Sequence, residues 1–317
     1  MDEFELIRRF FQRQERGDGV LIGIGDDGAV IAPTANRKLV AVVDTLVAGV
    51  HYPTGFPASD IGYRALAVNL SDVAAMGGRP RWMTLALTLP EADADWLADF
   101  AGGLFDAASE YDVALIGGDT TRGEQTVISV QLLGDVREDA IMTRSGAKPG
   151  DSIYVTGTVG DAAGGLELLK IAAGDDDDTR YLISRFARPS ARVTFGAELA
   201  GIATAAIDLS DGLGTDLEKI LRASAVAGTI DIENLPLSPH LRRAVGEHRA
   251  SELALNGGDD YELCFSAKST DEARIADLAG ELDVRVTRIG ELCTGAGLTC
   301  VKAGKRIPYR DRGYRHF

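Results

Sequence analysis

A set of aspartates in this 317-residue chain adjoins apolar or glycine-rich sequence. The segments are GIGDDGAVI, AVVDTLVAG, AVNLSDVAAMGGRP, LIGGDTTRG, AIDLSDGLG and LNGGDDYEL, and the residues are Asp26, Asp27, Asp44, Asp72, Asp119, Asp208, Asp211, Asp259 and Asp260. Carboxylates that converge in an apolar setting repel one another, and burial without compensation is costly. A hard divalent cation is the usual compensation. An all-oxygen set without His or Cys favours Mg²⁺ or Ca²⁺ over zinc.

Each aspartate also has a purely structural interpretation. Gly-Asp is common turn chemistry, and Ser210 or Asp211 is suited to cap a helix that begins near Gly212. No D-x-D-x-D-G calcium loop is present, which favours magnesium held partly by the phosphates of a substrate. The sequence alone leaves open whether the aspartates converge.

The glycines beside these aspartates favour phosphate binding. GIGDDG, GGDTTRG and NGGDD allow close approach of the backbone, as phosphate sites require. The chain has no G-x-x-x-x-G-K-[ST] loop and no protein-kinase catalytic-loop set, and GIGDDG precedes its apolar stretch, unlike a dinucleotide fingerprint. We therefore expect any nucleotide to bind through a different fold.

Alternating strand and helix patterns must position these residues. β-branched runs flanked by glycines predict strands at 38–47, 81–89, 112–118, 126–136, 151–158, 204–210, 228–232, 260–267, 284–292 and 298–303. Helical periodicity predicts helices at 59–76, 91–110, 160–172, 190–201, 212–224, 238–247 and 270–280. Because apolar strand-type runs precede Asp44, Asp119 and Asp208, we expect these three residues at strand ends.

Two shorter segments have their own patterns. MDEFELIRRFFQRQ predicts an amphipathic helix with Phe4, Ile7, Phe10 and Phe11 on one side. The acidic run GDDDDT, residues 174–179, predicts an exposed loop between helices.

A change in character at RSGAKPGD, residues 144–151, predicts a domain boundary. We expect an α/β (α+β) chain of two domains, 1–143 and 144–317, each a mixed sheet covered by helices.

Composition excludes several classes of protein. The formal net charge of −15 with no basic cluster argues against nucleic-acid binding. No apolar run approaches the roughly 18 residues of a membrane span, and the N-terminus has no signal-peptide core, so no membrane association and a cytoplasmic location are expected. The three cysteines are too few and too far apart for a disulfide framework, and Cys264 in YELCF is expected to be buried.

The motifs together resemble the thiamine-monophosphate kinase family. GIGDD, DTLVAGVH, ALAVNLSDVAAMG, LIGGDTTRG, TRSGAKPGD, AIDLSDGL, GGDDYELCF and the terminal GYRHF occur in the order seen in that family. The resemblance implies the two-domain fold of the aminoimidazole ribonucleotide synthetase-like superfamily. It also implies ATP in a long cleft, an N-terminal domain that binds ATP and Mg²⁺ and forms a homodimer, and a C-terminal domain that completes the site.

The implied reaction is phosphorylation of thiamine monophosphate by ATP, giving ADP and thiamine diphosphate. Carried over by motif, the metal ligands are Asp27, Asp44, Asp72, Asp119, Asp208 and Asp211; the first five act in catalysis through the metal. The nucleotide-contacting positions are Gly118, Asp119, Arg144 and Ser210. The positions around thiamine are His51, Asp259 and Tyr314.

Two departures from the family pattern limit this transfer. Val42 and Val43 stand before Asp44 where the family often has hydroxyl residues, so a metal contact there must use a backbone carbonyl or water. Asp259 stands where the family often has Glu, which keeps the charge and shortens its reach by a methylene.

The acceptor chemistry is consistent with the lack of an obvious catalytic His or Lys. A phosphate monoester has a second pKa of about 6, so it is largely ionised near neutral pH and needs no general base. Several Mg²⁺ ions would screen the two anions for direct in-line transfer. The alternatives are another ATP-dependent synthetase reaction of the superfamily and a non-catalytic nucleotide- or divalent-ion-binding protein.

Overall fold

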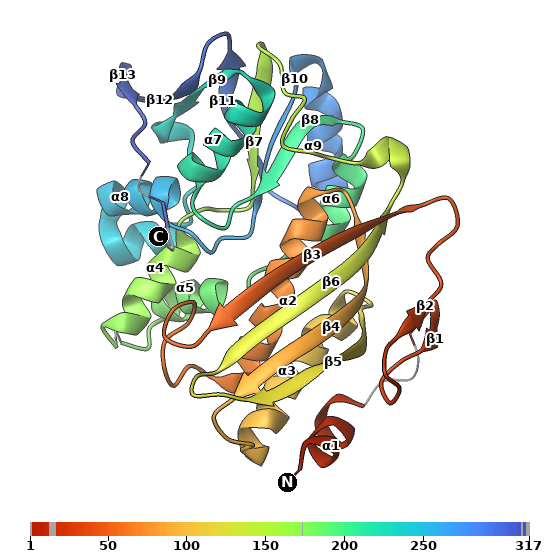
Figure 1. The fold of residues 1–317 in the computed structure, drawn as a ribbon. Coiled ribbons are helices and arrows are strands. Elements are labelled where there is room, and N and C mark those ends of the chain that lie inside the picture. Colours follow the sequence, from red (N-terminus) through yellow and green to blue (C-terminus); the bar gives the residue numbers. More distant parts are fainter. Residues whose placement is uncertain (1, 13–16, 173, 312, 315–317) are drawn as a thin grey trace. The chain divides into compact units, whose positions relative to one another are not determined.

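The computed structural model describes residues 2–12, 17–172, 174–311 and 313–314. They form two compact units, each with a sheet and helices (Figure 1). Unit 1 contains the described residues of Met1–Val73 and Gly78–Glu138, and unit 2 those of Ala74–Gly77 and Asp139–Phe317. This confirms the predicted class of fold. No helix in the described ranges is both long and apolar enough to cross a membrane.

Unit 1 is built on a four-stranded sheet in the order β3-β6-β4-β5. The strands are β3 (Lys38–Val47), β6 (Val127–Val136), β4 (Arg79–Leu89) and β5 (Ala114–Arg122). β6 pairs antiparallel with both β3 and β4, whereas β4 and β5 are parallel. Helices α2 (Ala58–Ala75) and α3 (Ala94–Glu110) lie behind one face of this sheet (Figure 1).

Glycines allow α2 and α3 to pack with their backbones almost touching. A Cβ at Gly62 would lie 2.0 Å from the carbonyl oxygen of Phe100, and one at Gly103 would lie 1.7 Å from that of Ser59. No larger residue fits at either position without moving a helix.

A ribbon of β1 (Val20–Ile22) and β2 (Val30–Ile31) packs on the same sheet through Val20 and Ile31, against Trp82 and Ile116. The predicted N-terminal helix is divided into α1 (Glu3–Leu6) and a π-helical turn, Ile7–Phe11. Phe10 and Phe11 are buried as expected and Ile7 is half-buried. The side chain of Phe4 lies outside the described residues.

Unit 2 has a seven-stranded sheet in the order β13-β12-β9-β11-β7-β10-β8. The strands are β7 (Asp151–Thr156), β8 (Ala203–Asp208), β9 (Ala227–Asp231), β10 (Leu263–Lys268), β11 (Val286–Cys293), β12 (Gly297–Lys302) and β13 (Lys305–Pro308). The helices are α4 (Asp161–Lys170), α5 (Asp177–Ala187), α6 (Val193–Leu199), α7 (Leu213–Ser224), α8 (Pro239–Asn256) and α9 (Glu272–Glu281). Short 3₁₀ turns span Glu138–Ala140, Ile232–Asn234 and Ser269–Asp271. Every residue of the interior strand β7, which lies between β11 and β10, is buried.

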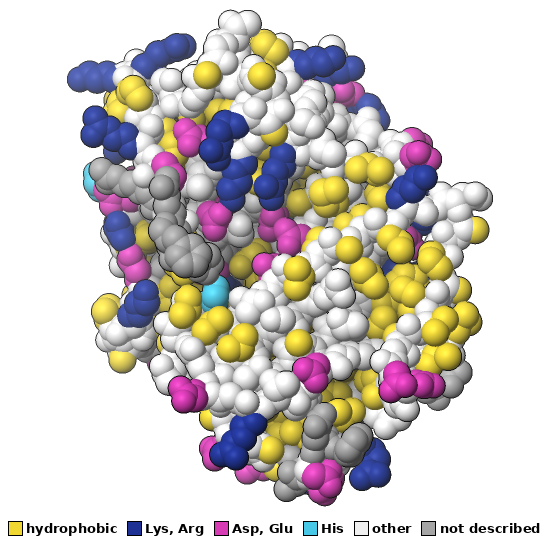
Figure 2. Space-filling model, in the orientation of Figure 1, with side chains coloured by type: hydrophobic (Ala, Val, Ile, Leu, Met, Phe, Trp, Pro, Cys, Tyr) yellow, Lys and Arg dark blue, Asp and Glu magenta, His cyan; other side chains and the backbone are white. Residues whose placement is uncertain are grey.

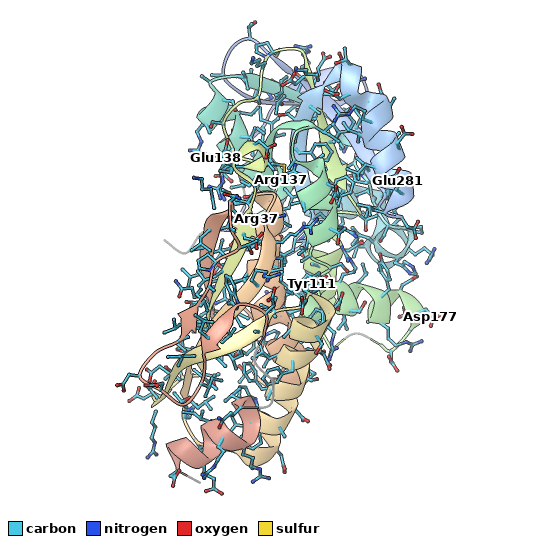
Figure 3. The ribbon with its side chains drawn as sticks, turned by 90° about the vertical axis from the view of Figure 1, so that its right-hand side faces the viewer. Arg37, Tyr111, Arg137, Glu138, Asp177 and Glu281 are labelled. Atoms are coloured by element: carbon cyan, nitrogen blue, oxygen red, sulfur yellow. The ribbon has the colours of Figure 1, made fainter. Side chains whose placement is uncertain are left out.

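The prediction of a loop at 174–179 is wrong in part, because α5 begins at Asp177. The carboxylate of Asp176 caps this helix, accepting hydrogen bonds from the Thr179 N–H and hydroxyl, both at 2.9 Å. Asp177 lies at the solvent-facing start of the same helix (Figure 3). Acidic side chains are favourable at a helix N-terminus, so the run begins a helix; residues 174–177 remain exposed, whereas Thr179 is buried.

Of the three aspartates expected at strand ends, only Asp208 lies at one, as the last residue of β8. Asp44 and Asp119 lie inside β3 and β5. Residues 45–47 are β-forming and pair with Val127–Ser129, so β3 continues past Asp44.

Candidate active site

A cavity of about 560 Å³ in unit 1 brings three of the sequence-predicted site residues together, namely Asp27, Gly118 and Asp119. One wall is the glycine-rich segment 23–29, which includes Asp27, and the other is formed by Leu115–Thr120 of β5, which includes Asp119. Ile7 and Phe11 supply apolar side chains. The cavity therefore combines an apolar surface with glycine backbone and carboxylates, a combination suited to a base and its phosphates.

Because Gly118 has no side chain, β4 and β5 can lie in close contact at this cavity. A Cβ at Gly118 would lie 1.9 Å from the carbonyl oxygen of Leu85, so no side chain fits. The neighbouring Gly117 has open space where a Cβ would be. Gly118 thus allows β5 to carry Asp119, which is exposed, along the cavity wall.

Asp44 and Asp72 do not line this cavity. Asp44 is half-buried on β3, which β6 and β4 separate from the strand of Asp119. Asp72 is half-buried near the end of α2, among fully buried neighbours. Within unit 1, the sheet therefore does not place Asp44 beside Asp119.

His51 lies in the turn that follows β3, and its ring accepts a hydrogen bond from the backbone there. The backbone N–H of Val47 donates to its Nδ1 at 3.0 Å, while the His51 N–H donates to the Val47 carbonyl at 3.0 Å. Because Nδ1 is an acceptor, the neutral ring carries its proton on Nε2. His51 can therefore present an N–H donor from its other edge.

In unit 2, the loop that follows β8 is held by Asp216, which the sequence analysis did not single out. This carboxylate is fully buried in the first turns of α7. Its Oδ2 accepts the backbone N–H groups of Ser210, Asp211 and Gly212 at 3.0, 3.0 and 3.2 Å. Neither Ser210 nor Asp211 caps the helix, since Gly212 is the N-cap residue and makes no side-chain cap. A signal was present in the sequence: Asp216 has the spacing of the buried face that includes Leu213, Leu217 and Ile220.

Lys219 balances the charge of this loop. Its ammonium donates to Asp216 at 2.7 Å and to Asp211 at 2.6 Å. Burial lowers the pKa of Lys219, but the two carboxylates outweigh that effect and raise the pKa above its ordinary value. The Asp211 side chain is thus oriented by a cation that belongs to the protein itself.

The segment 257–262 packs directly against this loop. The N–H of Asp259 donates to the Ser210 carbonyl at 2.9 Å, and the N–H of Tyr261 donates to the Leu209 carbonyl at 2.9 Å. Asp259 and Tyr261 adopt positive φ values of 72° and 51°, which are unfavourable for residues other than glycine. Two of the motifs named above, AIDLSDGL and GGDDYELCF, are thereby joined, with Asp208, Ser210, Asp211 and Asp259 in one region.

A buried ionic cluster supports the strained segment. Glu262 is fully buried and accepts hydrogen bonds from Arg192 at 2.6 and 2.7 Å, from Arg185 at 2.8 Å and from Thr156 at 2.7 Å. Burial works to raise the pKa of Glu262, but Arg192 and Arg185 hold it below its ordinary value. Burial raises the pKa of the adjacent Asp260 well above its usual range.

The chain's C-terminal segment reaches the same loop. The N–H of Tyr314 donates to the Asp211 carbonyl at 3.3 Å, and its side chain is 46% exposed. Residues 315–317 of the GYRHF motif lie outside the described residues. Arg144, also in unit 2, has an exposed side chain, and its carbonyl accepts a hydrogen bond from Ser224 at 3.1 Å.

The site residues present a donor set suited to magnesium. Over the ranges that the structure describes, no three His, Cys, Asp or Glu side chains form a group able to hold a metal ion by themselves. Mg²⁺ does not require such a cage, because it commonly binds through one or two carboxylates together with substrate phosphates and water. Asp27 and Asp119 at the glycine-lined cavity fit that manner of binding.

Comparison with known proteins places the chain in a family. The model for the N-terminal domain of AIR synthase related protein matches residues 25–136, and that for the C-terminal domain matches residues 148–302. The thiamine-monophosphate kinase of Escherichia coli (strain K12) is 46% identical over 320 residues, covering 99% of this chain and 98% of that protein.

Two solved structures are similar along nearly the whole chain. The thiamine-monophosphate kinase from Stenotrophomonas maltophilia K279a has a TM-score of 0.89 at 47% identity, covering 95% of this chain and 96% of that one. A structure described as AaThiL complexed with AMPPCP and TMP has a TM-score of 0.81 at 33% identity, covering 99% and 97%. This chain therefore belongs to the thiamine-monophosphate kinase family, among the AIR synthase related proteins.

Proposed function

We propose that the protein transfers the γ-phosphoryl group of ATP to thiamine monophosphate, giving ADP and thiamine diphosphate. The observation that carries this proposal is the 46% identity with a thiamine-monophosphate kinase over 99% of the chain. The similar structure that contains AMPPCP, an ATP analogue, together with TMP supports both substrates.

The nucleotide is assigned to the cavity between segment 23–29 and β5. Its apolar side chains suit a purine, and its glycines leave backbone N–H groups accessible to phosphate oxygens. Gly118 and Asp119 belong to this cavity. Ser210 and Arg144 are also assigned to the nucleotide, because a guanidinium such as that of Arg144 can bind a phosphate through two hydrogen bonds.

Magnesium is assigned to Asp27, Asp44, Asp72 and Asp119 in unit 1 and to Asp208 and Asp211 in unit 2. When bound, the cation neutralises phosphate charge and polarises the transferring group. Asp208 is assigned this role from its place in the AIDLSDGL motif, where it is the last residue of β8 and 5% exposed.

The protein's own residues would then act by binding and orienting the two phosphates for direct in-line transfer. Thiamine monophosphate supplies an acceptor oxygen that is already ionised near neutral pH, so no side chain has to remove a proton. The protein therefore has to hold the two phosphate groups in line and exclude water from them.

The thiamine end of the acceptor is assigned to His51, Asp259 and Tyr314. Thiamine carries a permanently positive thiazolium ring, which a carboxylate and the face of an aromatic ring both stabilise. Asp259 is half-buried and has a positive φ, and the Tyr314 residue is 46% exposed. The Nε2–H edge of His51 is a suitable hydrogen-bond donor to thiamine.

We further propose a homodimer formed through unit 1. The sheet face opposite α2 and α3 carries exposed apolar side chains, among them Leu39 at 51% and Val43 at 63% exposure on β3. Figure 2 shows hydrophobic side chains over part of this face, with uncharged polar side chains or backbone between them. An exposed apolar sheet face is typical of a protein interface. Val43→Glu should shift the protein from dimers to monomers in sedimentation velocity. If the wild type already sediments as a monomer, the dimer is rejected.

A product assay tests the reaction. Purified protein with ATP and Mg²⁺ should form ADP and thiamine diphosphate from thiamine monophosphate, and little product from free thiamine, which offers an un-ionised alcohol. Nucleotide binding without ADP release would favour a non-catalytic protein. ADP release without thiamine diphosphate would indicate another synthetase reaction. We expect the activity in the cytoplasm, where ATP is abundant.

A further inference from the structure

A hydroxyl group on α7 contacts the segment that precedes Tyr314. Thr215 Oγ1 donates to Asp311 Oδ1 at 2.7 Å and lies 3.3 Å from the Tyr309 hydroxyl. The same Asp311 oxygen accepts the N–H of Gly313 at 3.0 Å, which closes an Asx turn. Thr215 therefore holds the carboxylate that turns the chain just before Tyr314.

The packing around this hydroxyl leaves almost no free space. A Cβ at Gly313 would lie 2.1 Å from Thr215 Oγ1 and 2.7 Å from the Asp211 carbonyl. A Cβ at Gly214 would lie 2.3 Å from the Tyr309 ring. Gly214 on α7 and Gly313 on the C-terminal segment thus permit the close approach that brings the Tyr314 N–H to the carbonyl of Asp211.

We propose that Thr215 is a positioning residue for the thiamine monophosphate site. Through Asp311 and Gly313 it fastens the C-terminal segment to the loop of Asp211, so that the exposed Tyr314 ring is presented to the acceptor. This inference rests on the proposed function for its substrate. Its structural part, the attachment of Asp311 and Gly313 by the Thr215 hydroxyl, does not.

The test compares Thr215→Val, which keeps the shape and removes the hydroxyl, with the wild type. A lost hydrogen bond corresponds to a roughly 2- to 12-fold change in an equilibrium. The KM for thiamine monophosphate should rise by about that factor, whereas kcat and the KM for ATP stay within about twofold, as expected when only binding of the acceptor is weakened. Amide hydrogen exchange at Tyr314 should accelerate by a similar factor.

Two further variants distinguish positioning from general damage. Thr215→Ser retains the hydroxyl and should restore both readouts. Thr179→Val, in α5, removes a comparable hydroxyl-to-aspartate hydrogen bond and should change neither.

A wild-type KM and wild-type exchange in Thr215→Val would overturn the proposal, as would a raised KM with unchanged exchange at Tyr314. If the wild type forms no thiamine diphosphate but exchange at Tyr314 still responds, the proposed function fails while the attachment stands.

Discussion

The carboxylate of Asp216 and the ammonium of Lys219 lie 2.7 Å apart on α7, and both also bind the loop that precedes this helix. Asp216 fixes the backbone of residues 210–212, whereas Lys219 fixes the side chain of Asp211. One buried ion pair therefore determines where three consecutive loop residues lie.

Replacing Asp216 by Ala should loosen that loop. Three backbone N–H groups would lose their acceptor, and each unsatisfied buried donor costs about 1–3 kcal/mol. We expect a lower free energy of unfolding in urea and a higher KM for ATP, since Ser210 is assigned to the nucleotide. Asp216→Asn keeps one acceptor oxygen and should lose less. Equal stability of Asp216→Ala and the wild type would contradict this account.

Asp119→Asn should abolish turnover while the protein stays folded. The side chain is exposed, so the free energy of unfolding should change by about 0.5 kcal/mol or less. We expect kcat to fall by about two orders of magnitude or more, because an amide is a poor magnesium ligand. Asp112→Asn is the control: this exposed residue just before β5 has φ 53°, which Asn tolerates. Near-normal turnover in Asp119→Asn would remove this residue from the metal site.

Gly118→Ala should destabilise unit 1, and Gly117→Ala should not. The added methyl at Gly118 would collide with the Leu85 carbonyl, whereas the one at Gly117 meets open space. We expect a loss of about 1–3 kcal/mol for Gly118→Ala, as found for overpacked sites. Thermal or urea unfolding of the pair measures the difference, and identical stabilities would show that β4 and β5 separate easily here.

Glu262 should make stability depend on pH in the acidic range. Because its pKa is lowered in the folded protein, its contribution is complete above the ordinary value of 4.5 and is lost as pH falls through the lowered pKa. Glu262→Gln should lower the free energy of unfolding at pH 7. Below pH 4.5 it should lose less further free energy of unfolding than the wild type does. Asp260, whose pKa is raised, shifts stability in the opposite direction in both proteins, so the difference between their unfolding curves isolates Glu262. Parallel pH profiles would contradict the assignment.

Local sequence patterns predicted most of the regular elements. The strand predicted at 38–47 coincides with β3, and the helix predicted at 212–224 differs from α7 by one residue. The helix predicted at 238–247 instead continues to Asn256 through a kink at Gly246, which has φ 77°. Alternation and helical spacing identify a core-facing segment, but its end depends on what it packs against.

The contacts that build the candidate site were not visible in the sequence. Asp216 binds the backbone of residues 210–212 and Thr215 binds Asp311, and nothing in local spacing indicates the second pairing. The buried Cys264 was predicted, because an apolar strand buries its residues whatever their partners, and burial raises the pKa of its thiol. The acidic run at α5 was misjudged because the same composition suits a loop and a helix start.

The topology of unit 2 has a kinetic consequence. Its interior strand β7 pairs on both sides with partners from much later in the chain, Asp151 with Lys268 and Thr156 with Val286. Such non-local pairings slow folding, because long loops must close before the sheet is stabilised. During that interval a strand that is wholly buried in the folded protein, with Ile153, Tyr154 and Val155 at its centre, is exposed to other molecules, so refolding yield should fall steeply as protein concentration rises.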